Sequence, residues 1–174
     1  CKGGCPIGQD IPEYIELCRK GQYAAALEVI LEKNPLPFIT GTICAHHCMD
    51  KCTRNFYERS VQIRATKLVA AERGYDQVLP LLKPAAPVTD GRKVAVVGGG
   101  PTGMAAAYFC ARGGIPTTIF EKEAALGGVV RHVIPAFRIS DEAIEKDAAL
   151  VRKMGVEVKL NTPAPSVEEL KAQG

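Results

Sequence analysis

Apolar and polar positions divide the chain into two parts with different periods. Through residues 1–78, apolar side chains recur every three or four positions, which is typical of amphipathic helices. The pattern predicts helices that begin near Asp10, run over residues 22–33, and extend from Val61 to a stop at Gly74. No segment of this part is a convincing strand. We therefore expect an all-helical unit.

The second part of the chain alternates between strand and helix patterns. Strands are predicted over residues 93–97, 117–120 and 156–160, with helices between them, the later one over about 141–154. Strands that are separated by helices usually pair in parallel. We expect part of an α/β Rossmann-like domain. After it, a capping box at Ser166-Val167-Glu168-Glu169 predicts the start of a further helix.

Prolines mark the boundary between the two parts. Pro80, Pro84 and Pro87, followed by the turn sequence Thr89-Asp90-Gly91, predict a semi-rigid linker. The expected divisions are an alpha-helical, ferredoxin-like domain, a linker and the first part of a nucleotide-binding domain, over residues 1–78, 79–91 and 92–174.

Composition narrows the class of protein. Of 174 residues, 47% are hydrophobic and 24% are charged, which excludes general disorder. No apolar run approaches the roughly 20 residues that span a bilayer, and no signal-peptide pattern is present. A net charge of +3 is too small to indicate nucleic-acid binding. We expect a cytoplasmic protein that binds neither nucleic acid nor membrane.

A glycine-rich turn follows the first predicted strand. Gly98-Gly99-Gly100-Pro101-Thr102-Gly103 is G-x-G-x-x-G between a strand and a helix, the context in which it indicates dinucleotide binding. Gly98 permits the tight turn, Gly100 lets the backbone approach a pyrophosphate, and Gly103 lets helix and strand pack closely. The helix N-terminus then offers free N–H groups to the phosphates.

An acidic residue and a second glycine turn favour FAD. Glu121 ends the second predicted strand, where a carboxylate accepts hydrogen bonds from ribose hydroxyls. Leu126-Gly127-Gly128 resembles the continuation of flavoproteins, in which a second glycine turn passes the FAD. Lys122 and Arg138 complete the predicted cofactor-binding residues. The alternatives are a domain for NAD alone and a turn without a nucleotide.

Five of the seven cysteines fall in two groups, Cys1 with Cys5 and a later group of three. Their odd total and the missing secretion signal argue against disulfides and favour metal binding. Cys1-Lys2-Gly3-Gly4-Cys5-Pro6 matches C-x₃-C-P, the end of the bacterial ferredoxin motif, whose last cysteine serves a different cluster from the others. Cys1 and Cys5 would then ligate separate clusters.

The second group, Cys44, Cys48 and Cys52, has i, i+4, i+8 spacing. In a helix these thiols would lie along one face over roughly 12 Å, too far for all three to share one cluster. Cys5, Cys44 and Cys48 would serve one cluster, and Cys1 with Cys52 the other. Zinc is the alternative metal, with His46 or His47 as a further ligand. Cys18 and Cys110 are expected to be small buried side chains.

The order of these parts resembles one family of oxidoreductases. It is similar to the small (beta) subunit of NADPH-dependent glutamate synthase and to its relatives, which include the N-terminal part of dihydropyrimidine dehydrogenase, the large subunit of NADH-dependent ferredoxin:NADP oxidoreductase and selenate reductase subunits. The segments that carry the resemblance are Cys1–Pro6, 34–37, 43–52, 61–63 and Ile134-Pro135-Ala136-Phe137-Arg138.

The resemblance implies two 4Fe-4S clusters in the helical domain, FAD on the first Rossmann half, and NAD(P)H on a further domain. Hydride would pass from nicotinamide to flavin, and single electrons would leave through the clusters to a partner domain or subunit. No residue is predicted as a general acid, base or nucleophile. The different reading of the same parts is a non-catalytic nucleotide-binding or assembly module with zinc or metal-free thiols.

Three features differ from the family pattern. The cysteine pair expected before Cys1 is absent, so the second cluster is incomplete in this chain. Lys67 stands where relatives place a glutamine or glutamate ligand, and a protonated lysine has no lone pair to give. The nicotinamide domain does not follow within the 174 residues. We expect a fragment that does not turn over by itself.

Overall fold

The computed structural model describes residues 1–88 and 91–173, and it divides into two compact units, Cys1–Leu81 and Leu82–Gly174. We call them the helical unit and the α/β unit. Within the described ranges, none of the helices combines the length and the apolar character needed to cross a bilayer.

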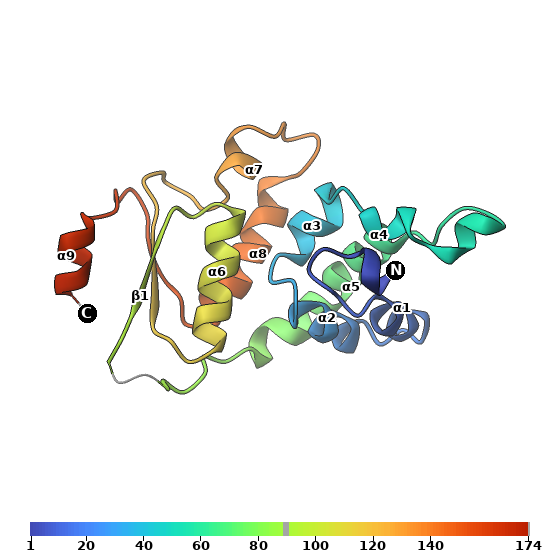
Figure 1. The fold of residues 1–174 in the computed structure, drawn as a ribbon, viewed down its shortest axis with the longest axis horizontal. Helices are drawn as coiled ribbons and strands as arrows, with labels where there is room; N and C mark the ends of the chain where they lie inside the picture. Colours follow the sequence, from blue (N-terminus) through green and yellow to red (C-terminus); the bar gives the residue numbers. More distant parts are fainter. Residues whose placement is uncertain (89–90, 174) are drawn as a thin grey trace. The chain divides into compact units, whose positions relative to one another are not determined.

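The helical unit contains only helices and loops among its described residues, as predicted (Figure 1). Its first long helix begins where the sequence indicates: the Asp10 side chain accepts a hydrogen bond from the Glu13 N–H at 3.4 Å. The elements are η1 Lys2–Gly4, α1 Ile11–Arg19, α2 Tyr23–Leu31, α3 Pro37–Ile43, α4 His47–Asp50, η2 Thr53–Phe56, α5 Ile63–Val78 and η3 Leu79–Leu81.

The core of this unit lies between α1, α2 and α5. Its buried members are Ile11, Tyr14, Ala26, Ile30, Ile63 and Ala70. Cys5 and Cys48 are partly buried and pack against this core. The core therefore brings an N-terminal cysteine and one from the later group to the same apolar surface.

The predicted end of the third helix at Gly74 is wrong, because α5 continues to Val78. Gly74 lies on the buried face of α5, where α2 approaches. A Cβ atom at this position would lie 2.6 Å from the carbonyl oxygen of Tyr23 and 3.1 Å from the Cα atom of Ala24. Gly74 is thus a point of close helix packing and not a C-cap.

The single helix considered for Cys44, Cys48 and Cys52 does not form. Cys44 has extended backbone (ψ 138°) after the end of α3, His46 is left-handed (φ 49°), and Cys52 precedes η2. Only Cys48 lies within a helix, the four-residue α4. The Arg64 guanidinium donates to the Cys44 carbonyl oxygen at 3.1 Å, so a side chain from α5 supplies the donor that a continued helix would have provided.

The α/β unit contains a parallel three-stranded sheet of order β1-β2-β3, which confirms the predicted strands and their direction. Figure 1 shows α6 and α8 on the same face of this sheet. The Ser166 capping box forms with Glu169 at the start of α9. The elements are β1 Val94–Val97, α6 Pro101–Arg112, β2 Thr117–Phe120, α7 Val129–His132, α8 Asp141–Lys153, β3 Glu157–Lys159 and α9 Val167–Ala172.

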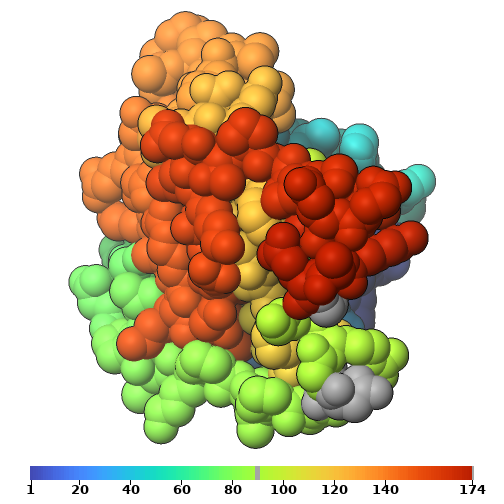
Figure 2. All heavy atoms as spheres, turned by 90° about the vertical axis from the view of Figure 1, so that its left-hand side faces the viewer, coloured from blue at the N-terminus to red at the C-terminus, as the bar shows by residue number. Residues whose placement is uncertain are grey.

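The segment after η3 packs on the α/β unit (green in Figure 2). The Val88 N–H donates to the Gly114 carbonyl oxygen at 3.2 Å. Pro84 and Pro87 line a small hollow together with Gly114 and Gly155. Thr89 and Asp90, the first two residues of the predicted turn, lie outside the described residues.

The sign of the change in the free energy of unfolding of Gly74→Ala tests the α2–α5 contact. Alanine in a helix interior is normally more stable than glycine by up to about 1 kcal/mol. Because the new Cβ would meet backbone atoms, we expect Gly74→Ala to lower the free energy of unfolding by about 1–3 kcal/mol in urea titrations. Gly3→Ala, whose Cβ would have no neighbour within 4 Å, is the control. A stabilised Gly74→Ala protein would contradict the packing.

Candidate functional site

The first glycine turn lies at the carboxyl end of β1. Gly98 has φ 94°, a conformation that side-chain-bearing residues rarely adopt, and its N–H donates to the Phe120 carbonyl oxygen at 2.9 Å. A Cβ atom at Gly103 would lie 2.0 Å from the Gly98 carbonyl oxygen, so α6 packs directly on the turn. At Gly100 the nearest atom to an added Cβ is 3.9 Å away. The three glycines therefore have the geometry expected of the motif.

Glu121 holds the turn from the neighbouring strand. The side chain is buried, with the residue 5% exposed, and Oε2 accepts from the Gly99 N–H at 2.6 Å. Its Oε1 accepts from the Glu123 N–H at 2.9 Å. The sequence indicated a ribose acceptor at this position but gave no sign of these backbone contacts. Each carboxylate oxygen keeps a further lone pair for a ligand hydroxyl.

The second glycine turn is bonded to the first. The Gly127 N–H donates to the Gly99 carbonyl oxygen at 2.9 Å. Both Gly127 (φ 125°) and Gly128 (φ 51°) have positive φ values. A Cβ atom at Gly128 would lie 2.9 Å from the Gly100 Cα atom, so the two turns meet backbone to backbone.

A cavity of about 510 Å³ opens at this end of the sheet. It brings together five of the predicted cofactor residues, Gly98, Gly100, Glu121, Lys122 and Gly128. Pro101, Thr102, Gly103 and Gly127 lie in or behind the turns, and Arg138 is exposed outside the lining. The remaining lining residues were not predicted as site residues: Val97, Phe120, Glu123, His132, Pro163 and Ala164.

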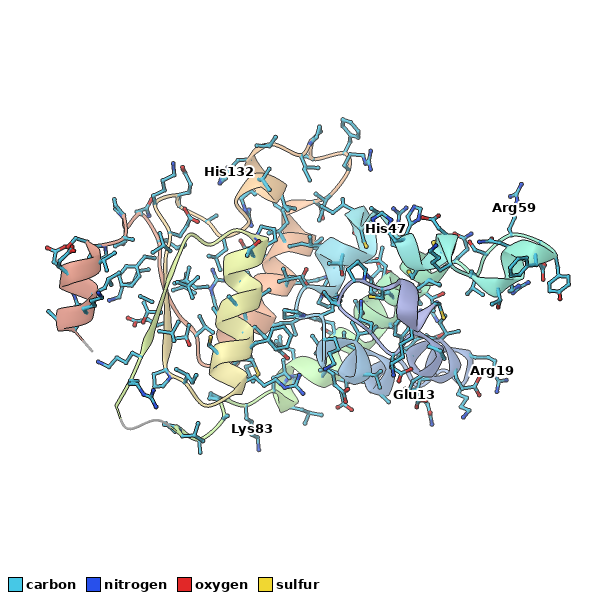
Figure 3. All side chains as sticks on the ribbon, viewed as in Figure 1. Glu13, Arg19, His47, Arg59, Lys83 and His132 are labelled. Carbon is cyan, nitrogen blue, oxygen red and sulfur yellow. The ribbon has the colours of Figure 1, made fainter. Side chains whose placement is uncertain are left out.

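His132 and Arg131 have different surroundings although they are adjacent. His132 is the last residue of α7 (Figure 3). It also lines the cavity. Arg131 instead donates to the Leu126 carbonyl oxygen at 2.7 Å and forms ion pairs with Asp141 and Glu145 at 3.2 and 2.5 Å. Arg131 therefore links the second glycine turn to α8 through one hydrogen bond and two ion pairs. Pro163 and Ala164, which follow β3, form part of the cavity wall, and no sequence motif predicts them.

In the helical unit, three of the predicted metal-binding thiols lie around one buried lysine. Lys67 is on the buried face of α5 and only 4% exposed. Burial lowers the pKa of its ammonium group, and the nearby thiols of Cys44, Cys48 and Cys5 oppose that shift. The pKa of the Cys48 thiol is raised, first by burial and then by Cys5 and Cys44. The three thiols therefore lie close enough to Lys67 to influence its charge.

Cys52 has a different environment from those three. Backbone N–H groups of Val61 and Arg54 lower the pKa of its thiol, and the positive charges of Arg54 and of the amino terminus at Cys1 act in the same direction. Cys1 itself is exposed. The loop after Cys52 extends away from the helices, and Figure 3 shows Arg59 pointing outward from it. The amino group of Cys1 is thus close enough to influence the Cys52 thiol, and the pairing of the two cysteines remains a prediction.

Two buried polar atoms near the thiols have no hydrogen-bond partner. Among the described residues, Gln9 Oε1 and His46 Nδ1 are the only buried side-chain nitrogen or oxygen atoms in that condition. Gln9 Nε2 lies 3.8 Å from Cys5 Sγ, and the His46 backbone N lies 3.4 Å from Cys44 Sγ. In the described ranges no three His, Cys, Asp or Glu side chains converge on the position of a single metal ion, so the thiols near Lys67 do not form a ready-made site for one ion. Cys18 and Cys110 are half-buried, and so less buried than predicted from the sequence.

Two family profiles match the chain. The profile described as dihydropyrimidine dehydrogenase domain II, 4Fe-4S cluster, matches residues 1–77. The profile described as NAD(P)-binding Rossmann-like domain matches residues 96–145. These matches confirm the predicted fold class, a helical iron–sulfur domain followed by part of a Rossmann-like domain.

Several relatives are similar over nearly the whole chain. YgfK of Escherichia coli (strain K12), named as an oxidoreductase, is 46% identical over 100% of this chain. The small chain of NADPH glutamate synthase from Mycobacterium tuberculosis is 33% identical over 91% of the chain. The beta subunit of NADPH-Fe(3+) oxidoreductase from Geobacter sulfurreducens is 34% identical over 98%. The chain spans 17%, 32% and 26% of the lengths of these relatives, respectively.

The environments of the cysteines predict an order of reaction with iodoacetamide. Only the thiolate reacts, so a lowered pKa moves labelling to lower pH. In the metal-free, reduced chain we expect Cys52 to be labelled first as the pH rises, and Cys18 and Cys48 last, because burial raises the pKa of both. Peptide mass mapping between about pH 6 and pH 9 measures the order. In urea the differences should disappear. Labelling of Cys48 before Cys52 in the folded chain would contradict the structure.

Proposed function

The chain belongs to the family of the glutamate synthase small subunit, and from this membership we propose that it is the electron-transfer portion of an NAD(P)H-dependent iron–sulfur flavoprotein oxidoreductase. Electrons from NAD(P)H would pass through FAD and 4Fe-4S clusters to a partner site. The observation that carries the proposal is that one chain joins a unit with clustered thiols to a unit with a glycine-lined nucleotide cavity.

The first cluster would be held by Cys5, Cys44 and Cys48. Thiolates are the usual ligands of iron–sulfur clusters. The buried ammonium of Lys67 supports this assignment, because it would offset the negative charge of a thiolate-bound cluster. The unpartnered Gln9 Oε1 also supports it, since a buried polar atom without a partner is rare in a finished core.

A second cluster would use Cys1 and Cys52 with further ligands. The proximity of the Cys52 thiol to the amino terminus at Cys1 supports this pairing. So does the contrast between the two thiol environments, one packed against the core and the other at the surface. Assignment of these five cysteines to metal is consistent with a reducing compartment, and we therefore keep the cytoplasm as the proposed location.

The nucleotide at the cavity would be FAD. The backbone of Gly98–Gly100 would face the pyrophosphate, and Glu121 would accept from the ribose while keeping its bonds to the N–H groups of Gly99 and Glu123. Contact between the two glycine turns supports FAD, because Gly128 lines the same cavity as Gly100. A bound flavin accepts two electrons as hydride and can release them singly, which a cluster requires.

The acceptor of the electrons would be another domain or subunit. Support comes from the names of the relatives, which describe a small chain of glutamate synthase and beta subunits of an iron(III) oxidoreductase and of an NADP-dependent formate dehydrogenase. Subunits of this kind act in larger assemblies. The differences among the named activities indicate that the partner, and not this portion, determines the final substrate.

Anaerobic reconstitution with ferrous iron and sulfide tests the cysteine assignment. We expect the 174-residue chain to become brown and to contain acid-labile sulfide. Cys1→Ser together with Cys52→Ser should keep one cluster, since the proposed first site does not use them. Cys44→Ser in that background should lose it, as measured by iron, sulfide and absorbance. A colourless chain that binds stoichiometric zinc and no iron would refute the assignment.

Gly100→Val tests the nucleotide assignment without disturbing the fold. The added Cβ has no neighbour within 3.9 Å, and φ −72° suits any residue, so the variant should unfold at the same urea concentration as the parent. A side chain here would block the pyrophosphate. We expect the intact polypeptide that contains this chain to lose most of its FAD, measured as flavin released on denaturation. Gly113→Ala, where a Cβ makes only ordinary 3.4 Å contacts, is the control. Unchanged flavin in Gly100→Val would contradict the assignment.

A further inference from the structure

Two acidic residues line the cavity that would receive a pyrophosphate. Glu121 and Glu123 both contribute to its wall, beside the glycine turn of Gly98 and Gly100. A dinucleotide carries a negative charge on each of its two bridged phosphates, so these carboxylates oppose its binding. The N-terminus of α6 supplies only a partial positive charge. A basic side chain at the same place would offset the remaining repulsion.

Most basic side chains near the two glycine turns are engaged elsewhere. Arg131 is held by a backbone carbonyl oxygen and by two carboxylates of α8. Lys122 lines the cavity, but its ammonium group lies 3.8 Å from the Glu123 carboxylate. Arg138 is exposed and lies outside the lining. The other basic residue of the cavity lining is His132.

His132 lies one helical turn after Gly128, which also lines the cavity. Its backbone N–H donates to the Gly128 carbonyl oxygen at 3.0 Å. Residues four apart in a helix are neighbours, about 5–6 Å between their Cβ atoms, and helical side chains lean toward the N-terminus of their helix. The imidazole of His132 (Figure 3) therefore leans toward Gly128, which meets Gly100 backbone to backbone.

The imidazole of His132 has no partner in the described part of the chain. None of the described side chains or backbone groups forms a hydrogen bond or an ion pair with it. The residue is exposed, so both ring nitrogens are accessible, and a protonated imidazole donates two hydrogen bonds. The adjacent Val133 is also exposed but lies outside the cavity lining. The residue that can carry a charge is thus the one that lines the cavity.

We propose that His132 binds the pyrophosphate of the dinucleotide. This inference rests on the proposed function and adds a contact to the same cavity. The protonated imidazole donates a hydrogen bond to a phosphate oxygen and offsets the carboxylates of Glu121 and Glu123. Its role is to hold the cofactor, and it takes no part in the transfer of hydride or electrons.

Such a contact makes the affinity for FAD depend on pH. Histidine gains its proton as the pH falls from about 8 to 5, whereas a pyrophosphate diester keeps its charge over this range. Binding should therefore be tighter at low pH and weaken as the imidazole loses its proton. The other charged groups near His132 are Glu121, Lys122, Glu123 and Arg131 with its two carboxylate partners on α8. These groups are the same in the parent and in the variants below, so a difference between the pH profiles reports on His132.

The experiment measures the dissociation constant of FAD for the flavin-free intact polypeptide that contains this chain, from flavin fluorescence at about pH 6 and pH 8.5. At pH 6 we expect His132→Gln to bind FAD about five- to tenfold more weakly than the parent, because it loses a charge-assisted hydrogen bond. Its affinity should also vary less with pH. His132→Lys should bind as tightly as the parent at pH 6 and keep that affinity at pH 8.5, since its ammonium group stays charged.

Val133→Gln is the matched control, because it adds the same amide one residue away and outside the cavity lining. It should have the affinity and the pH profile of the parent. The flavin-free His132→Gln protein should unfold at the same urea concentration as the parent, since the described residues make no bond to the imidazole. A lower unfolding midpoint would mean a structural role and would overturn the proposal.

Equal affinities and equal pH profiles of the parent and His132→Gln would also overturn it. So would weak binding by His132→Lys at pH 6, because the charge would then be irrelevant. If the parent binds FAD and Gly100→Val does not, while His132→Gln is unaffected, the error lies at His132 alone. A parent that binds no FAD would refute the proposed nucleotide site and the role of His132 together.

Discussion

The α/β unit depends on the two hydrogen bonds made by one residue, Gly99. Its N–H donates to the Glu121 carboxylate at 2.6 Å, and its carbonyl oxygen accepts from Gly127 at 2.9 Å. A Cβ atom at this position would lie 2.3 Å from Cδ2 of Leu126, so a larger residue here would require the Leu126 side chain to move. Through Gly99 the end of β1 is joined to the end of β2 and to the second glycine turn. The cavity exists because these three segments are held at fixed distances while Gly98 and Gly100 remain at its surface.

In the helical unit, the comparable constraint is the end of α3 before Cys44. Because Cys44 leaves the helical conformation, its carbonyl oxygen loses the donor that a continued helix would provide, and Arg64 replaces it at 3.1 Å. The chain then turns at His46, and Cys48 returns to the core beside Cys5. Gly4 makes the return possible, since a Cβ there would lie 2.9 Å from Lys51 and 3.2 Å from the Cys48 backbone. Cys5 is thus brought to the same buried lysine of α5 as Cys44 and Cys48.

Local sequence signals predicted the features that depend on neighbouring residues. The strands, the helix that becomes α8, the Asp10 cap and the Ser166 capping box all arise from patterns within a few positions. The predictions were wrong where residues distant in the sequence determine the local structure. Gly74 resembles a helix stop, but the backbone of α2 requires a residue without a side chain there. The cavity wall at Pro163 and the bond between the Glu121 carboxylate and the Gly99 N–H also depend on tertiary contacts, and no motif predicts them.

The two candidate sites differ in how far the polypeptide completes them alone. The glycine turns are closed by their own hydrogen bonds, so a nucleotide would meet a preorganised surface and little ordering energy would be lost on binding. Around the thiols, by contrast, the unit buries Lys67 and leaves Gln9 Oε1 without a partner. These groups destabilise the metal-free fold and would be compensated only when a thiolate-bound cluster is present. The stability of the helical unit should therefore depend on its cofactor to a greater degree than that of the α/β unit, because metal binding and folding are linked where the polar groups of a core are incomplete.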